Sequence, residues 1–348
     1  MAEMSYADDI RSVSALDLPW TALGGCNILI TGATGLIGSC MVDVLMNNPK
    51  RDYCVYAAGR NEVNARERFR DYLGDGRFHF LKYDVREALD SDVDFHYVIH
   101  AASNASPNFF STKPVEVMLS NIEGVKNLLD YGIGHNMRRF MYVSSGEVYG
   151  EGDGRDFTEE YSGYVDITKP RSCYPSSKRA AETLCVSYAA EYGADVVIVR
   201  PSHTYGPHFT SSDNRVYAQF IRNALKGEDI VMKSSGSQYR SWCYVVDCVS
   251  AMFYVLLKGE TMQAYNIADH QSNITIMELA RMISRISGTK VVCEDPSDGE
   301  KAGYNTVTKS VFDTHKTEQL GWSISGTMEE KLQKTIQVRQ RMLSGSFS

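Results

Sequence analysis

Tyr174 and Lys178 stand four residues apart in YPSSK, at the start of the helical pattern KRAAETLCVSYAAEY. This spacing places both side chains on one face of a helix, about one turn apart. The Lys178 ammonium and a positively charged ring bound beside the phenol would each favour the phenolate form of Tyr174 and lower its pKa from the ordinary value of about 10. Such a tyrosine can remove a proton from a hydroxyl group near neutral pH. Because amphipathic helices often contain this pair without catalysis, other motifs must support it.

A polar run, Ser144-Ser145-Gly146-Glu147, follows the apolar segment RFMYV. The segment predicts a buried strand, and ligands bind at the carboxyl ends of strands in parallel sheets. Ser145 is therefore expected to hold a substrate hydroxyl near the phenol of Tyr174. Glu147 is a candidate general acid or base, although a glutamate at a strand end can also serve only as a hydrogen-bond acceptor.

Three glycines at three-residue intervals, Gly32, Gly35 and Gly38, lie in GATGLIG directly after the apolar run NILIT. A strand, this turn and a helix together point backbone amides at a pyrophosphate. Glycine suits the turn because the backbone must bend tightly and approach the ligand closely. The pattern predicts a dinucleotide site, and a glycine-rich turn without a ligand is the structural alternative.

The second predicted strand lacks the terminal acidic residue that usually binds the ribose hydroxyls of a dinucleotide. The sequence there is Ala57-Ala58-Gly59-Arg60-Asn61. Arg60 either pairs with a ribose 2′-phosphate, which favours NADP, or stacks on the adenine while NAD binds, or lies in a solvated loop. Asp84, at the end of the third predicted strand, is expected to accept a hydrogen bond from the adenine amino group or to cap a helix.

Short apolar runs alternate with helical patterns from Asn27 onward, which predicts an α/β fold with a doubly wound parallel sheet of the Rossmann type. We expect an N-terminal extension over 1–26 that includes a short amphipathic helix, a dinucleotide-binding domain over 27–200 that 241–268 rejoins, and a smaller α/β substrate domain over 201–348. The strands predicted in the first domain are 27–31, 54–58, 78–83, 97–102 and 139–145, and the helices are 37–47, 62–73 and 115–132.

The composition is that of an ordinary globular protein, with 43% hydrophobic and 23% charged residues. The 36 Lys and Arg residues are outnumbered by 43 Asp and Glu residues, which argues against a nucleic-acid surface. No segment is apolar and long enough to predict a signal peptide or a membrane span. The eight cysteines form no C-x-x-C pair, so we expect reduced thiols in a cytoplasmic protein. The histidines show no metal-ligand spacing.

Eight segments carry a family resemblance that covers Asn27 to about Trp322: TGATGLIG, HAAS, NIEG, SSGEVYG, YPSSK, RPSHTYGP, YRSWCYVVD and YNIA. Together they resemble the extended short-chain dehydrogenase/reductase family of NAD-dependent epimerases and dehydratases, whose members modify nucleotide sugars. The resemblance implies an enzyme that binds NAD, with NADP as the alternative, and a nucleotide-sugar substrate. It also implies a homodimer built through the helices that contain YPSSK and NIEG.

Three sets of residues are expected at the site. The cofactor set is Gly32, Thr34, Gly35, Leu36, Ile37, Gly38, Arg60, Asp84, Val85, Ala101, Ala102, Ser103, Asn121, Tyr174, Lys178 and Pro201. The substrate set is Ser103, Ser145, Gly146, His203, Arg215, Gln219 and Arg240. The catalytic set is Ser145, Glu147, Tyr174 and Lys178.

The segments GEVYG, KPRSCYPSSKRAAET, HTYGPHFTSSDNRV and SGSQYRSW are similar to those of UDP-glucuronate decarboxylases. This likeness implies transient oxidation at sugar carbon 4, with Tyr174 as the base, Lys178 tuning it and Ser145 orienting the substrate. A ketone at carbon 4 makes the neighbouring carboxylate a β-keto acid, which loses carbon dioxide readily. The ketone also acidifies the hydrogen on carbon 5, so epimerisation and dehydration stay open, with Glu147 as acid or base.

Two further hypotheses differ in chemistry. An NADP-dependent sugar reductase, which releases its cofactor after each turnover, has its best support in Arg60. A regulator that senses dinucleotide without catalysis would not need Ser145, Tyr174 and Lys178, so their presence argues against that hypothesis.

Some positions depart from the family pattern. Gly146 stands where dehydratases of the family carry an acidic Asp, and His203 and His208 replace an Asn and an Arg near the expected diphosphate. Decarboxylases carry an Arg-Lys-Pro stretch that meets the substrate carboxylate, whereas this chain has Thr308-Lys309-Ser310-Val311. A lysine is not an equivalent bidentate partner.

Arginines are the other candidates for binding the nucleotide. Arg240 resembles the family arginine that holds the diphosphate, for which a guanidinium fork is suited, and a surface salt bridge is its alternative role. Arg215 and Gln219 are expected near the nucleotide base.

Overall fold

The computed structural model describes residues 5–210, 213–294 and 307–344. Its largest sheet has seven strands, and every pair of neighbouring strands in it is parallel. This confirms the predicted doubly wound sheet of the Rossmann type. In order across the sheet, the strands are β10 Gln263–Ile267, β6 Val196–Pro201, β5 Arg139–Val143, β4 Tyr97–His100, β1 Asn27–Thr31, β2 Cys54–Gly59 and β3 Phe78–Lys82.

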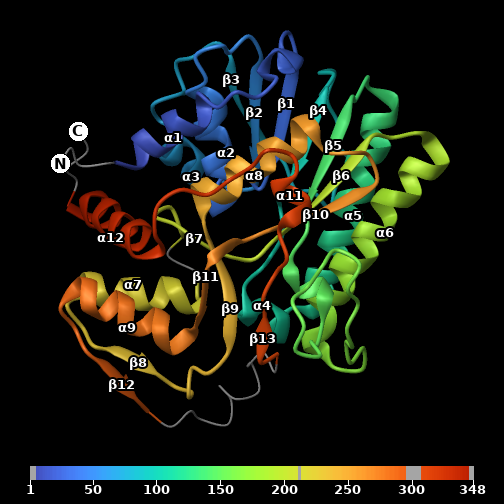
Figure 1. The fold of residues 1–348 in the computed structure, drawn as a ribbon. Helices are drawn as coiled ribbons and strands as arrows, with labels where there is room; N and C mark the ends of the chain where they lie inside the picture. The colour runs from blue at the N-terminus through green and yellow to red at the C-terminus, as the bar shows by residue number, and fades with distance from the viewer. Residues whose placement is uncertain (1–4, 211–212, 295–306, 345–348) are drawn as a thin grey trace.

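Helices cover both faces of this sheet (Figure 1). Ile28 and Ile30 of β1 join one buried cluster with residues of α2 and α8, whereas Leu29 joins a second cluster with residues of α5 and α6. Successive side chains of a strand point to opposite faces, so one short strand contributes to both cores. These helices are α2 Leu36–Met46, α5 Pro114–Gly134, α6 Cys173–Tyr192 and α8 Val245–Lys258.

A smaller sheet lies beside the large one, with β9 at its centre between β11 and β13, and with β7 also paired to β9 (Figure 1). The first buried cluster continues from the large sheet into α7, α9 and α12, so the two parts share one hydrophobic core. The elements of this part are β7 His203–Tyr205, α7 Val216–Lys226, β8 Ile230–Met232, β9 Tyr239–Tyr244, β11 Asp269–Thr275, α9 Ile276–Ser287, β12 Val291–Cys293 and β13 Lys309–Ser310.

The predicted strands of the first part all form, and the largest departure is in the helix predicted over 62–73. Helix α3 ends at Arg68, whose guanidinium pairs with Asp43 of α2, and Phe69 then turns into the core. The chain after β9 returns to the large sheet, because α8 covers it and β10 pairs with β6 at its edge. The shorter helices are α3 Glu62–Arg68, α4 Pro107–Thr112 and α11 His315–Glu318.

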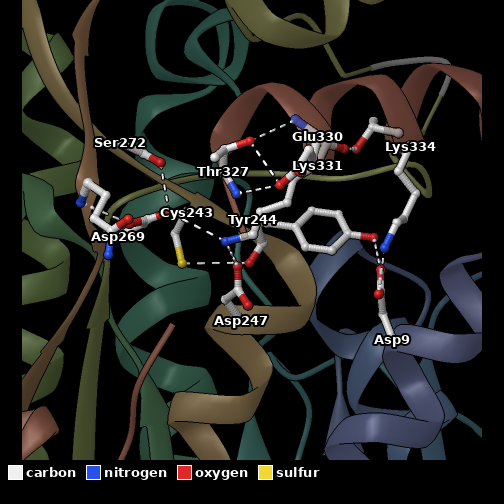
Figure 2. A network of polar contacts seen from close by, with 12 residues as sticks. Asp9, Cys243, Tyr244, Asp247, Asp269, Ser272, Thr327, Glu330, Lys331 and Lys334 are labelled. Carbon is white, nitrogen blue, oxygen red and sulfur yellow. Dashed lines mark hydrogen bonds and ion pairs between the residues drawn. The ribbon is translucent and has the colours of Figure 1, made fainter. Parts of the chain in front are cut away.

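Helix α1, Tyr6–Ser14, brings the N-terminal segment against the C-terminal helix α12, Met328–Ser344 (Figures 1 and 2). Ile10 of α1 is buried, as are the predicted docking residues Leu18 and Trp20. Lys334 of α12 approaches a carboxylate oxygen of Asp9 to 2.6 Å. The predicted amphipathic helix therefore forms, and it is held by both apolar and ionic contacts.

Lys331 of α12 joins the two sheets through two buried carboxylates (Figure 2). Its Nζ lies 2.8 Å from Asp247 of α8 and 3.5 Å from Asp269 at the start of β11. Burial raises the pKa of Asp247 to about 6, and the nearby Lys331 ammonium opposes that rise. The lysine is thus the positive charge that allows two carboxylates to lie close together in the interior.

Replacement of Lys331 by Met is expected to destabilise the fold, because it leaves Asp247 and Asp269 buried without their cation. Losing one partner of a buried ion pair costs about 3 kcal/mol of the free energy of unfolding, measured by chemical denaturation. The matched control is Lys126→Met, which breaks an exposed pair with Asp130 and should leave the denaturation midpoint nearly unchanged. Equal midpoints for the two variants would contradict this role of Lys331.

Candidate active site

The carboxyl ends of β1 to β4 surround a cavity of about 220 Å³. This is the edge where parallel sheets bind ligands. Leu36, Ile37 and Gly38 of the cofactor set form the first turn of α2 beside the cavity instead of lining it. The members of the set that line the cavity are Gly32, Thr34, Gly35, Arg60, Asp84, Val85, Ala101, Ala102 and Ser103.

The glycines of GATGLIG meet demands of the fold itself. Gly32 has a φ of +67°, and a Cβ there would lie 2.7 Å from the carbonyl oxygen of Ala101. A Cβ on Gly38 would lie 2.4 Å from the carbonyl oxygen of Gly32. Gly35 is the N-cap of α2 and offers no side chain to the first turn of the helix. The turn between β1 and α2 therefore packs tightly, with its amides beside the cavity.

Asp84, which is predicted to bind the adenine, forms an ion pair within the protein itself. Its carboxylate accepts hydrogen bonds from Nε of Arg86 at 3.1 Å and from Nη2 at 2.7 Å. These bonds lower the pKa of Asp84. Asp84 does not precede a helix, so the alternative role as a helix cap is wrong. Arg86, which the sequence prediction missed, lines the same cavity as Arg60.

A chain of hydrogen bonds connects the cavity to helix α6. The hydroxyl of Ser103 donates to Oδ1 of Asn121 at 2.8 Å, and the Asn121 amide donates to the hydroxyl of Ser177 at 2.9 Å. Ser177 in turn donates to the carbonyl oxygen of Tyr174 at 3.0 Å. Asn121 is buried in α5, so this chain fixes the start of α6 relative to β4. Pro201 of the cofactor set lies buried at the end of β6.

Tyr174 and Lys178 lie one turn apart in the first half of α6, and both are buried. The ring of Tyr174 stacks on Phe110 with a centroid distance of 4.6 Å, and its hydroxyl hydrogen-bonds with Ser145 and Ser103. The Lys178 ammonium donates to the carbonyl oxygen of Val143 at 2.9 Å and lies 5.8 Å from the centroid of the Tyr174 ring. The structure therefore brings together the predicted phenol, ammonium and Ser145 hydroxyl.

In the protein without a dinucleotide, the pKa of Tyr174 is not lowered. Burial raises the pKa of Tyr174 to about 12, and its interactions with the hydroxyls of Ser145 and Ser103 only partly oppose this. Burial also lowers the pKa of Lys178 to about 7. Desolvation disfavours the charged form of each group, so near neutral pH the phenol keeps its proton and the lysine titrates.

Glu147 is held by an arginine that the sequence prediction missed. The guanidinium of Arg171 binds both carboxylate oxygens of Glu147, at 2.6 and 2.8 Å, and stacks on Phe110 at 5.2 Å from the ring centroid. To act as a general acid or base, Glu147 would first have to separate from Arg171. The only signal for Arg171 in the sequence is its place three residues before Tyr174.

Arg240 is a buried cation without a carboxylate partner among the residues that the structure describes. Its guanidinium donates to the backbone carbonyl oxygens of Tyr239 and Val307. Burial lowers the pKa of Arg240 to about 10, and the charge of Glu147 opposes this. The alternative role of Arg240 in a surface salt bridge is therefore wrong, and a buried cation of this kind favours an anionic ligand.

The other predicted substrate residues lie in different surroundings. Desolvation and the charges of Arg240 and Arg215 lower the pKa of the His203 ring, although the residue as a whole keeps exposed surface. Arg215 pairs with Asp213 at 2.5 Å, so its charge is already compensated. Gln219 is exposed on α7, one turn after Arg215. Only Arg240 combines burial with the lack of a carboxylate partner.

The positions that depart from the family pattern have local explanations. A Cβ on Gly146 would lie 2.0 Å from Cζ of Phe312, so the Phe312 ring fills the space of a side chain at 146. His208 packs its ring edge on Tyr6 of α1 at 4.7 Å and is held by the N-terminal segment. Lys309 lies 2.7 Å from Asp156 and donates to the carbonyl oxygen of Gly154, so its charge is compensated. Residues 211–212 of the HTYGPHFTSSDNRV segment lie outside the described residues.

The family model described as "NAD dependent epimerase/dehydratase family" matches residues 28–268. The chain belongs to this family. It is 34% identical to UDP-glucuronic acid decarboxylase 6 of Arabidopsis thaliana over 309 residues, which are 88% of this chain and 86% of the relative. It is 32% identical to UDP-glucuronic acid decarboxylase 1 of Xenopus tropicalis over 312 residues, 89% and 71% of the two chains. The predicted family resemblance is confirmed.

Among solved structures, UDP-glucose 4-epimerase of Thermotoga maritima in complex with UDP-glucose has a TM-score of 0.77 and is 26% identical, covering 91% of this chain and 99% of its own. No helix of residues 5–210, 213–294 and 307–344 has the length and apolar character needed to cross a bilayer. Within the same residues, no three His, Cys, Asp or Glu side chains gather as a metal site would require.

Replacing Gly146 by Ala is expected to destabilise the fold by about 1–3 kcal/mol, because its methyl group would overlap the Phe312 ring. The matched control is Gly134→Ala at the end of α5, where a Cβ meets no atom within 4 Å. Chemical denaturation measures both free energies of unfolding. The two effects should be less than additive in the double variant with Phe312→Ala, and full additivity would contradict the contact.

Proposed function

We propose that this enzyme uses bound NAD to oxidise carbon 4 of a UDP-sugar transiently, and that its reaction is the decarboxylation of UDP-glucuronate. Two sequence relatives named for this activity support the substrate, at 32–34% identity over most of the chain. The structural observation that carries the proposal is the buried, carboxylate-free Arg240, which feels the charge of Glu147. A diphosphate-linked sugar supplies the anion that this cation lacks.

The cavity at β1 to β4 has the backbone features of a site for part of a dinucleotide. The tight Gly32 turn and the side-chain-free N-cap Gly35 leave the first amides of α2 accessible to a pyrophosphate. We assign the dinucleotide to residues 27–200 together with 245–268, because 241–244 of the predicted segment 241–268 belong to β9 of the smaller sheet. We assign the nucleotide sugar to the remaining C-terminal segments and 1–26 to a docked extension. Bound NAD would accept the hydride of carbon 4 and later return it.

Residues of α6 and of the segment after β5 carry out the proton transfer. Ser145 orients the carbon 4 hydroxyl by a hydrogen bond, and Tyr174 accepts its proton. Because burial holds the pKa of Tyr174 at about 12, the phenolate needs a positive charge nearby, and protonated Lys178 provides one.

The ketone at carbon 4 makes the carboxylate on carbon 5 a β-keto acid. The bond between carbon 5 and the carboxylate then breaks, its electron pair passes to the ketone oxygen as an enolate, and carbon dioxide leaves. A proton taken up at carbon 5 restores the ketone before it is reduced. The hydroxyls of Tyr174 and Ser145 hold the oxygen on which this negative charge develops.

Epimerisation is the second candidate, and Lys309 favours it. Its ammonium is occupied by Asp156, so this segment offers no free cation to a sugar carboxylate. The structurally similar Thermotoga maritima enzyme is a UDP-glucose 4-epimerase, which acts on a sugar without that group. Dehydration has less support, because Phe312 fills the space that an acidic side chain at 146 would need.

The deciding experiment is incubation of the purified protein with a panel of UDP, dTDP, GDP and CDP sugars, with the products analysed by mass spectrometry and NMR. We expect UDP-glucuronate to lose carbon dioxide and the other sugars to remain unchanged. Replacement of Tyr174 by Phe should abolish turnover while the protein still binds NAD, because the hydroxyl takes the proton but does not shape the cavity.

The matched control is Tyr192→Phe, an exposed tyrosine at the end of the same helix, which should keep full activity. Activity of the Tyr174→Phe variant would contradict the base. Inversion at carbon 4 without loss of mass would replace decarboxylation by epimerisation.

We also propose that the chain is a homodimer built on α5 and α6, in the cytoplasm, where its eight free thiols stay reduced. Val115, Met118 and Leu119 of α5 expose apolar surface. Leu119→Glu should convert the dimer to a monomer in light scattering, because a charge would be buried at the contact. Ile167→Glu, at an exposed residue outside these helices, is the control and should leave the mass unchanged. A monomeric wild-type protein would contradict the proposal.

A further inference from the structure

We infer that Tyr142 is a positioning residue of the active site, whose ring face holds the ammonium of Lys178 and maintains its positive charge. The inference rests on the proposed function, in which that charge supports the base Tyr174. Nζ of Lys178 lies over the Tyr142 ring, 4.7 Å from its centroid, and is 5.8 Å from the centroid of the Tyr174 ring. A cation within about 6 Å of a ring centroid is attracted by the negative charge of the ring face.

The Lys178 ammonium has more hydrogen-bond donors than the protein has acceptors for it. An ammonium group carries three N–H donors. Among the residues that the structure describes, it donates only to the carbonyl oxygen of Val143 and forms no ion pair. Lys178 is 1% exposed, so solvent contributes little. The ring of Tyr142 therefore compensates part of the cost of burying this cation.

The hydroxyl of Tyr142 does not explain why this residue lies here. Tyr142 is buried, and its hydroxyl oxygen has no hydrogen-bond partner in the part of the chain that the structure describes. Because a buried hydroxyl without a partner costs stability, the ring and not the hydroxyl is the useful part of the side chain. Tyr142 and Val143 are successive residues of β5, so one strand contacts Lys178 both through a ring and through a carbonyl group.

The other titratable groups around Lys178 supply no free negative charge. On α6, the carboxylate of Glu182 favours the ammonium but is paired with Arg200 at 2.7 Å. Burial raises the pKa of the Cys185 thiol on the same helix, so this thiol stays neutral. On β4, burial and the charge of Lys178 lower the pKa of His100 to about 3, so the imidazole is neutral too.

The test is an NMR titration of the full-length protein, isotope-labelled at the ε-carbon of lysine, with every variant in the same dinucleotide state. The Lys178 signal should titrate at about pH 7, well below exposed lysines, and should be absent from Lys178→Met. Tyr142→Leu should lower this pKa by about one unit, because the ring no longer stabilises the charged form. The matched control is Phe140→Leu, in the same strand and buried cluster, which should leave the pKa unchanged.

A second series keeps the core filled, in case Tyr142→Leu does not fold. Tyr142→Phe retains the ring and should retain the pKa of Lys178. Phenylalanines with increasing numbers of ring fluorines at the same position should lower that pKa stepwise, because fluorine withdraws electron density from the ring face. The shape of the ring hardly changes, so a role in packing alone predicts no trend. An unchanged pKa across the fluorinated series would overturn the inference.

The effect on turnover follows from the direction of the shift. The charge of Lys178 is present below its pKa and is lost as the pH rises through it. With a pKa of about 7 lowered by about one unit in Tyr142→Leu, kcat on UDP-glucuronate should fall about twofold at pH 6 and about tenfold at pH 8, with little change in KM.

An equal loss at both pH values, or no loss, would contradict the positioning role of Tyr142. If the wild-type protein converts no UDP-sugar, the proposed function is wrong. The NMR titration separates the two failures, because it measures the stabilisation of the Lys178 ammonium by Tyr142 without turnover.

Discussion

Desolvation of the Tyr174 and Lys178 pair is the constraint around which the site is built. Both groups are buried on one face of α6, and burial disfavours the charged form of each. The phenol therefore stays neutral, and the pKa of the lysine falls to about 7. The surrounding structure keeps this pair usable, because the Val143 carbonyl orients the lysine and the hydroxyls of Ser145 and Ser103 meet the phenol. Because the phenol holds its proton more tightly than the lysine does, forming the phenolate requires a positive charge close by.

The arginines of the site differ in which groups compensate their positive charges, and this difference distinguishes their roles. Arg171 is occupied by Glu147 and Arg215 by Asp213, so both act first on neighbouring side chains. Arg240 has only carbonyl oxygens, which leaves one cation for an anionic substrate. At the far end of the large sheet, Arg86 and Arg60 repeat this contrast between a paired and an unpaired guanidinium.

The large and small sheets keep a fixed relation because α12 joins them. Lys331 lies between carboxylates of α8 and β11, and the same helix holds α1 through Lys334 and Asp9. Since β9 runs from Arg240 to the start of α8, this junction lies at one end of the strand that carries the free cation. Helices α1 and α12, which are distant in sequence from the site residues, therefore support the strand that positions Arg240.

The amino-acid sequence by itself determined the alternation of strands and helices, the glycine turn and the placing of Tyr174, Lys178 and Ser145 at one edge, because local periodicity and backbone sterics decide these features. Tertiary structure alone decided the pairing of Glu147 with Arg171, the Phe312 ring over Gly146 and the docking of His208 on Tyr6. It also decided that burial raises the pKa of Tyr174 in the protein without a dinucleotide. These outcomes depend on which residues distant in the chain come into contact and on how much water they exclude. Local sequence spacing determines neither of these.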